Sequence, residues 1–191
     1  MARSTRLTPE RESELYEAVI DLLGEAGYDG LTMDAVAART RSSKATLYRQ
    51  WGSKPELVAQ ALRHHKPVRI ADIDTGSLRG DFHELISHSD DCRMEKDSAM
   101  MRGLAHAIHE NPELLQALRE LLIEPEMTGL DQVLRRAVER GEVRADNPAL
   151  DLVPHMVIGA FIARPLIEDR PVDQAFFRTY VDAVVLPALG V

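Results

Sequence analysis

The stretch from Leu31 to Leu57, LTMDAVAARTRSSKATLYRQWGSKPEL, most constrains what this chain can fold into. It holds two short helical patterns, over residues 33–39 and 44–50, separated by a polar turn over 40–42. The second pattern begins with small hydroxyl and basic residues and ends in aromatic and basic ones. These features are typical of a helix that enters the major groove of DNA.

The composition favours helices throughout the chain. Its 191 residues suffice for one or two domains with a substantial core. Only 5% of the residues are aromatic, Ala, Leu, Glu and Arg are abundant, and no segment alternates as a half-buried strand would. We therefore predict an all-α protein.

The N-terminal helices are marked by capping residues. Residues 1–7 read as a mobile polar arm, and Thr8 precedes a proline that suits the first position of a helix. Gly27 suits the end of that first helix. Thr32 caps the second helix, Ser43 the third and Ser53 a fourth. This order predicts a three-helix bundle with a connecting helix, which we assign to residues 1–66.

A second domain is expected over residues 67–191, after a polar connection from His64 to Gly76. Turn and breaker residues separate five further helical patterns there. They cover approximately 77–90, 96–110, 112–140, 147–164 and 172–189. Pro125 and Pro154 fall inside two of them, and each is expected to kink or end its helix, because proline removes a hydrogen-bond donor.

The charge distribution points to a polyanionic partner. The chain carries a net charge of -8, yet the segment 37–66 holds seven Lys or Arg residues and one acid, Glu56, a net +6 that leaves -14 elsewhere. A basic patch on an acidic body is the electrostatic pattern of a DNA-binding protein. A merely solvated basic helix surface is the alternative.

The last two helical patterns are apolar on more than one face. A helix of that kind must be buried. Burial against a second copy of the chain, through residues 147–189, predicts a homodimer with a four-helix interface. Burial within one chain is the alternative.

The residue types around the turn suit DNA contacts. Lys44 can donate to guanine acceptors, and Ser43 and Thr46 can reach bases or phosphates. Tyr48 lies one turn after Lys44 and can place its hydroxyl on the DNA backbone. Lys54, at the start of the fourth helix, can reach a phosphate.

About 45 contiguous residues resemble the TetR family of bacterial transcriptional regulators. The matching pieces are Gly27-Tyr28, Leu31-Thr32-Met33, Val36-Ala37, Ser43-Lys44, Thr46-Leu47-Tyr48, Trp51-Gly52-Ser53-Lys54 and Leu57. The C-terminal segments ARPLIEDRP and VDAVVLPAL resemble a subclass common in actinobacterial members.

The resemblance implies a homodimer of nine or ten helices per chain that represses transcription from a palindromic operator and leaves it on binding a small effector. Thr32, Ser43, Lys44 and Thr46 would contact bases or phosphates, and Tyr48 and Lys54 phosphates. Trp51 would be core, and Arg49 either a phosphate contact or solvated.

Three residues depart from the family pattern. Arg41 stands where glycine is common in the turn, where a left-handed conformation would cost about 1 kcal/mol. The turn therefore differs, or Arg41 reaches a phosphate. Gln50 replaces a more usual histidine, and Pro154 is unusual in the penultimate helix.

The effector site is expected among the middle helices of the second domain. Apolar or flexible side chains are the candidates, although for each one a place in an ordinary core is the favoured interpretation. They are Phe82, Leu85, Met100, Met101, Leu104, Ile108, Met127 and Phe161.

Other classes of function have weaker support. His106 and His109 share a helix face, with His83 and His88 nearby in sequence, but no third metal ligand stands out. No phosphate loop, nucleophile elbow or carboxylate pair indicates an enzyme, and we expect no cofactor.

The remaining expectations concern location and a rival function. The single cysteine, Cys92, the apparent absence of an apolar run of membrane-spanning length and the polar N-terminus predict a cytoplasmic protein without a membrane partner. The rival is a dimeric helical protein-interaction module that has lost DNA binding.

Overall fold

The protein is helical in the part of the chain that the computed structural model describes, residues 8–66 and 68–191. There are no strands in these ranges, and apart from the 3-10 turn at Ile70–Asp72 the helical elements join into nine continuous helical segments. The predicted all-α class is confirmed. The arm predicted over residues 1–7 lies outside the described residues.

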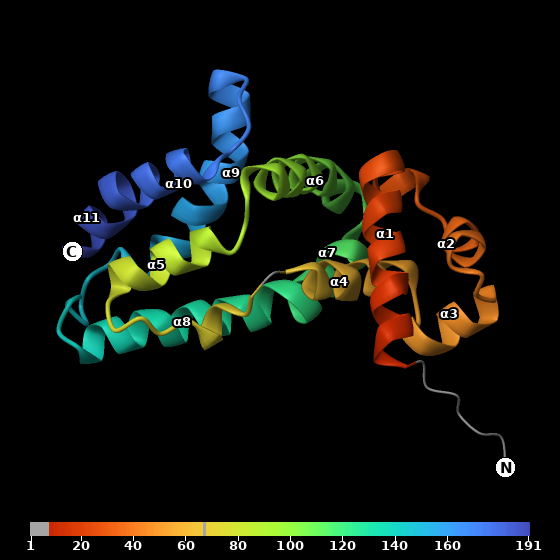
Figure 1. The fold of residues 1–191 in the computed structure, drawn as a ribbon, viewed down its shortest axis with the longest axis horizontal. Helices are drawn as coiled ribbons and strands as arrows, with labels where there is room; N and C mark the ends of the chain where they lie inside the picture. The colour runs from red at the N-terminus through yellow and green to blue at the C-terminus, as the bar shows by residue number, and fades with distance from the viewer. Residues whose placement is uncertain (1–7, 67) are drawn as a thin grey trace, which may run out of the picture. The chain divides into compact units, whose positions relative to one another are not determined.

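Four helices follow one another at the N-terminal end (Figure 1, red to gold). They are α1 (Pro9–Gly30), α2 (Met33–Thr40), α3 (Lys44–Trp51) and α4 (Lys54–His65). The predicted caps Thr8, Thr32, Ser43 and Ser53 each accept a backbone N–H from the residue three positions on. Gly27, with φ 67° and ψ 179°, breaks the end of α1 in a conformation that only glycine adopts readily.

One apolar face from each of these helices builds a common core. Leu15 of α1, Val36 of α2, Leu47 of α3 and Leu57 of α4 are all completely buried. Burying a leucine or valine side chain contributes roughly 1.5–3 kcal/mol. Helix α1 packs on both α2 and α4, and α3 in turn packs on α2 and α4.

The chain divides into two compact units, and two of the three borders between them fall inside helices. The first unit runs to Lys66 and also takes in Gly103–Glu124, which packs against α4. The second contains 68–102 and Pro125–Val191. The division into two functional domains at 66/67 stays a prediction. The compact units follow it at that point, but packing also assigns residues 103–124 to the first unit.

The remaining elements are helical. They are η1 (Ile70–Asp72), α5 (Leu78–Ser87), α6 (Asp91–Glu110), α7 (Pro112–Leu118), η2 (Arg119–Ile123), α8 (Glu124–Glu139), η3 (Leu150–Leu152), α9 (Val153–Glu168), α10 (Gln174–Tyr180), η4 (Val181–Val185) and α11 (Leu186–Leu189). Elements α10, η4 and α11 form one rod, the C-terminal rod, and α7, η2 and α8 follow one another without a gap in the sequence.

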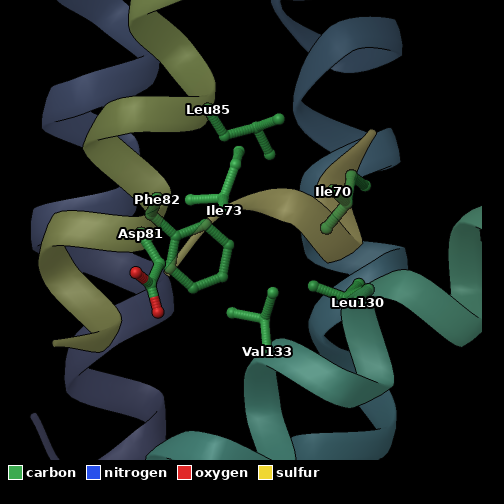
Figure 2. A pocket seen from close by; sticks show the side chains of 7 residues that line it. All are labelled: Ile70, Ile73, Asp81, Phe82, Leu85, Leu130 and Val133. Carbon is green, nitrogen blue, oxygen red and sulfur yellow. The ribbon is translucent and has the colours of Figure 1, made fainter. Parts of the chain in front are cut away.

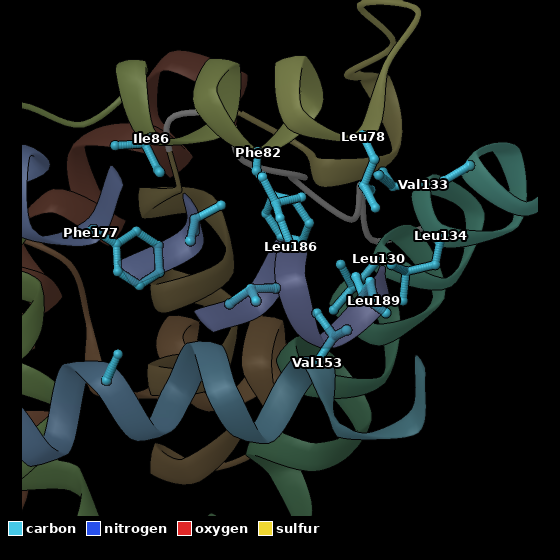
Figure 3. Close-up of a cluster of buried hydrophobic side chains, with 14 of the residues drawn as sticks. Leu78, Phe82, Ile86, Leu130, Val133, Leu134, Val153, Phe177, Leu186 and Leu189 are labelled. Carbon is cyan, nitrogen blue, oxygen red and sulfur yellow. The ribbon is translucent and has the colours of Figure 1, made fainter. Parts of the chain in front are cut away.

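The core of the second unit lies between α5, α8, α9 and the C-terminal rod (Figure 3). Phe82 of α5, Leu130 of α8, Val153 of α9 and Leu186 of α11 all point into it. Four elements distant in sequence therefore share one apolar interior.

The prolines act differently from the prediction. Pro125 does not end its helix, since α8 continues to Glu139; the π turn η2 precedes it, and the second π turn, η4, precedes Pro187. A wider turn accommodates the missing donor and the steric conflict of a proline ring. Pro154 lies in the first turn of α9, where its missing N–H needs no partner. The expectation that Pro154 interrupts a helix was wrong.

Helix α9 is more apolar than the sequence interpretation allowed. The segment Leu150–Glu168 has a mean hydropathy of 1.5, and by length and composition it could cross a membrane. An uninterrupted apolar run of this length is still absent from the segment, because Asp151 and Arg164 fall within it, and only the mean hydropathy reaches the value of a membrane span. Only 17% of this segment is buried within the chain, so α9 presents an uncovered apolar surface.

Candidate nucleic-acid interface

The turn between α2 and α3 keeps a left-handed residue although that residue is an arginine. Arg41 has φ 50° and ψ 37°. Its N–H donates to the carbonyl of Ala38, and the N–H of Ser42 donates to the carbonyl of Ala37. These two bonds define a Schellman motif. Arg11 of α1 also donates to the carbonyl of Thr40, which ties the turn to α1.

The same motif ends α8, and there the chain uses glycine. Gly141 has φ 76°, its N–H donates to the carbonyl of Val138, and the N–H of Glu142 donates to the carbonyl of Ala137. The turn between α2 and α3 therefore has the backbone conformation that glycine favours. The sequence left open that Arg41 signals a different turn, and this possibility is excluded.

Arg41→Gly is expected to stabilise the protein by about 1 kcal/mol, because it removes the steric cost of a left-handed side chain. The converse substitution Gly141→Arg should destabilise it by a similar amount. Urea denaturation followed by circular dichroism measures both. A destabilised Arg41→Gly variant would mean that the arginine side chain contributes more than its backbone strain costs.

The N-terminus of α3 is capped by its own hydroxyl groups. Ser43 Oγ accepts the N–H of Thr46 at 3.1 Å and lies 2.8 Å from Thr46 Oγ1. Thr32 Oγ1 accepts the N–H of Ala35 at 3.1 Å at the start of α2. The remaining unpaired N–H groups at two helix starts favour anions such as phosphate.

Lys44 is paired with an acid that lies outside the basic segment 37–66. Its Nζ donates to Asp34 Oδ2 of α2 at 2.8 Å, and this hydrogen bond raises the pKa of Lys44. Arg39 is likewise held by Glu25 of α1 at 2.8 Å. Two acids outside the segment 37–66 therefore partly neutralise a charge that the sequence alone puts at +6.

Six of the eight predicted DNA-contacting residues are exposed to solvent, and Thr46 and Lys54 are half-buried. The exposed residues are Thr32, Arg41, Ser43, Lys44, Tyr48, at 45%, and Arg49. Tyr48 lies one turn after Lys44, so both are presented on the outward surface of α3.

Lys54 lies at the start of α4 against an aromatic ring. Its Nζ is 4.0 Å from the ring centroid of Tyr28, and burial lowers the pKa of Lys54. The cation–π contact limits where the ammonium group can reach. Tyr28 is itself buried, which raises the pKa of its hydroxyl to about 12.

Trp51 closes the inner side of α3 and is only 2% exposed, which confirms its expected core role. Its indole Nε1 donates to the hydroxyl of Tyr16 at 3.0 Å, and the two rings meet edge to face with centroids 5.8 Å apart. The Tyr16 hydroxyl in turn donates to Glu12 at 2.9 Å. This cluster holds α3 against α1.

Sequence reasoning missed Asp34, Glu25 and the ring of Tyr28 as neighbours of the basic side chains. Asp34 has the position of an ordinary first-turn acid that favours a helix start. Its contact with Lys44 crosses from one helix to the next, so no periodicity within a helix indicates it.

The predicted effector residues are not gathered in one place. Phe82 and Leu85 of α5 line a small hollow with Ile73 and Val133 (Figure 2). The enclosed space of the hollow is about 10 Å³, room for about one water molecule. Ligand pockets commonly enclose about 300–1,000 Å³, so this hollow is too small for a typical effector.

The other six candidates are partly buried and do not line the hollow: Met100, Met101, Leu104, Ile108, Met127 and Phe161. Leu104 and Ile108 belong to the first compact unit, and Phe161 packs on Phe177 of the second, with ring centroids 4.9 Å apart. Their role as ligand contacts stays a prediction.

Two short helices joined by a Schellman turn, the second with a capped N-terminus and an exposed polar face, define a helix-turn-helix DNA-binding protein. Residues 15–61 match the family described as bacterial regulatory proteins, tetR family, and residues 72–184 match the tetracyclin repressor-like C-terminal domain. The chain therefore belongs to the TetR family, and it is a DNA-binding transcriptional regulator rather than an enzyme.

Relatives and solved structures agree with this assignment. An uncharacterized HTH-type transcriptional regulator of Mycobacterium tuberculosis is 37% identical over 94% of this chain and 88% of the relative. A DNA-binding transcriptional repressor TetR of Mycobacteroides abscessus is 33% identical over 92% of each chain. The crystal structure of the TetR family transcription regulator SCO0332 superposes with a TM-score of 0.71, at 30% identity, over 94% of this chain and 98% of that one.

Proposed function

We propose that the protein is a repressor that binds a palindromic operator as a homodimer and dissociates when a small molecule binds. The observation that carries the proposal is the outward surface of α3, where capped hydroxyls, a lysine and an exposed tyrosine share one helix. The relative from Mycobacteroides abscessus, named as a DNA-binding transcriptional repressor, supports the direction of regulation.

Helix α3 would lie in the major groove with Ser43, Lys44 and Thr46 toward base edges. Thr32, Tyr48 and Lys54 would contact phosphates and fix the position of α3 in the groove, and Arg41 and Arg49 have the exposure needed to reach the DNA backbone. Base contacts specify the operator, whereas phosphate contacts contribute to binding of any sequence.

The uncovered surface of α9 supports pairing of two chains through residues 147–189. Ile158, Ile162 and Leu166 lie four residues apart, so they share one face of the helix, and all three are exposed large hydrophobic residues. Val184 of η4 is exposed as well. An apolar stripe of this kind marks an interaction surface. Pairing would place the two α3 helices in successive major grooves, about 34–36 Å apart.

An effector would act by favouring a conformer in which this spacing is wrong. Its effect cannot exceed its preference for one conformer over the other. The hollow beside Phe82 is the starting point for such a site, and it would have to open to admit a typical ligand.

A regulator of transcription acts on the chromosome, which supports a cytoplasmic location. The comparisons do not favour the rival protein-interaction module without DNA binding.

The proposal is tested by replacing three contacts at once. The Lys44→Ala/Tyr48→Phe/Lys54→Ala variant should bind DNA on the order of 100-fold more weakly, with Lys44→Ala alone also changing base preference. Gel shifts with duplexes selected by the wild-type protein from a randomised pool measure both effects.

The control is a Lys96→Ala/Arg135→Ala variant, which also removes two positive charges, but from exposed positions on α6 and α8. It should bind like the wild type. Unchanged binding by the triple variant would rule out the proposed placement of α3.

A further inference from the structure

The acid that holds Lys44 lies within the surface proposed to face DNA. Asp34 is in the first turn of α2, two residues after Thr32, and its carboxylate receives a 2.8 Å hydrogen bond from the Lys44 ammonium group. Both side chains are largely exposed. A carboxylate near a polyanion opposes binding, so its presence here requires a reason beyond charge attraction.

A lysine beside a carboxylate distinguishes between two kinds of acceptor. The ammonium group has three donors, and Asp34 takes one of them, so two remain for the O6 and N7 acceptors of guanine. Those acceptors are neutral, whereas a phosphate oxygen carries negative charge and is repelled by the adjacent carboxylate. The pair therefore suits a base edge better than it suits a phosphate.

The exposure of the pair determines how strong this bias can be. Exposed ion pairs are weak and are screened by salt. Asp34 therefore guides the lysine without locking it in place, and a guanine can still compete for the donors. A bias of several-fold is the expected scale.

We infer that Asp34 is a specificity-determining residue, which keeps Lys44 from binding phosphates in non-operator DNA and directs it to a base edge in the operator. This inference rests on the proposed placement of Lys44 at the start of the recognition helix. Asp34 would act without touching a base, through the lysine that it holds and through repulsion of phosphates in any sequence.

The test compares Asp34→Asn with the wild type on two duplexes, one selected by the wild-type protein from a randomised pool and one scrambled from it. The substitution keeps the shape of the side chain and removes its charge. Affinity for the scrambled duplex should rise about fivefold. The slope of log affinity against log salt concentration should become more negative by about 0.9 for each protomer that gains a phosphate contact. Affinity for the selected duplex should rise less than about twofold, so the specificity ratio falls.

Two further variants separate specificity from simple charge removal. In the Lys44→Ala background, Asp34→Asn should no longer lower the ratio, because the lysine that it directs is absent. Glu25→Gln is the matched control, since it breaks the similar pair with Arg39 outside α3. It should leave the ratio unchanged.

The outcomes distinguish the placement of Lys44 from the role of Asp34. If Lys44→Ala leaves the ratio unchanged, the placement of Lys44 is wrong and the role of Asp34 falls with it. If Lys44→Ala lowers the ratio but Asp34→Asn does not, the inference about Asp34 alone is overturned. An equal fall in both the wild-type and Lys44→Ala backgrounds would overturn it as well, because Asp34 would then act independently of the lysine.

Discussion

Replacing Ile162 with glutamate is expected to convert the protein to monomers and to abolish tight operator binding. Ile162 is at the centre of the exposed stripe on α9, between Ile158 and Leu166. Burying an unpaired carboxylate from each chain at a shared interface costs several kcal/mol, and about 3 kcal/mol already weakens pairing more than 100-fold. Two half-sites would then be bound by separate chains, without the gain in affinity that comes from linkage.

Sedimentation equilibrium and gel shifts measure the two effects. The matched control is Ile123→Glu, since Ile123 is 38% exposed against 41% for Ile162 but lies in η2, outside residues 147–189. This variant should sediment like the wild type. Dimeric Ile162→Glu protein would place the pairing surface elsewhere on the chain.

Trp51→Ala is expected to destabilise the first compact unit by about 3–5 kcal/mol, as removal of a buried tryptophan commonly does. The substitution leaves a cavity between α1 and α3 and removes the indole donor from the Tyr16 hydroxyl. Tyr16 is buried, and burial raises the pKa of its hydroxyl to about 12. Since domains are stable by only about 5–15 kcal/mol, much of the unit's stability would be lost.

Hydrogen exchange should locate this loss. Protection should fall in α1 to α4 and remain in α5 and α8, which belong to the second unit. Trp51→Phe is the control, because it keeps an apolar ring and loses the hydrogen bond, so its effect should be closer to about 1–2 kcal/mol. A Trp51→Ala variant within about 1 kcal/mol of the wild type would show that α3 is held mainly by other contacts.

The helix starts were predictable because their signals are local. Thr8, Thr32, Ser43 and Ser53 were identified as caps from sequence, and each caps its helix. A cap depends on a hydroxyl group and an N–H three residues away. The left-handed turn at Arg41 could not be predicted from the residue itself, because arginine disfavours that conformation. The sequence showed only that arginine stands where the family commonly has glycine.

The neighbours of the proposed contact residues were not predictable in the same way. Asp34 meets Lys44 across ten positions, and Tyr28 lies beside Lys54 across 26. Such contacts depend on how helices pack, which capping and periodicity do not encode. Pro154 was misjudged for a related reason, because its effect depends on whether a helix starts before or after it.

The stripe on α9 has a genetic consequence. If two chains pair through this stripe as proposed, an allele that damages α3 leaves the pairing surface intact, because the stripe and α3 share no residues. The damaged subunit would then pair with a normal one and occupy it in a mixed dimer that holds only one half-site. Such an allele would be dominant over the wild type in a cell that carries both, whereas an allele damaged at Ile162 would be recessive.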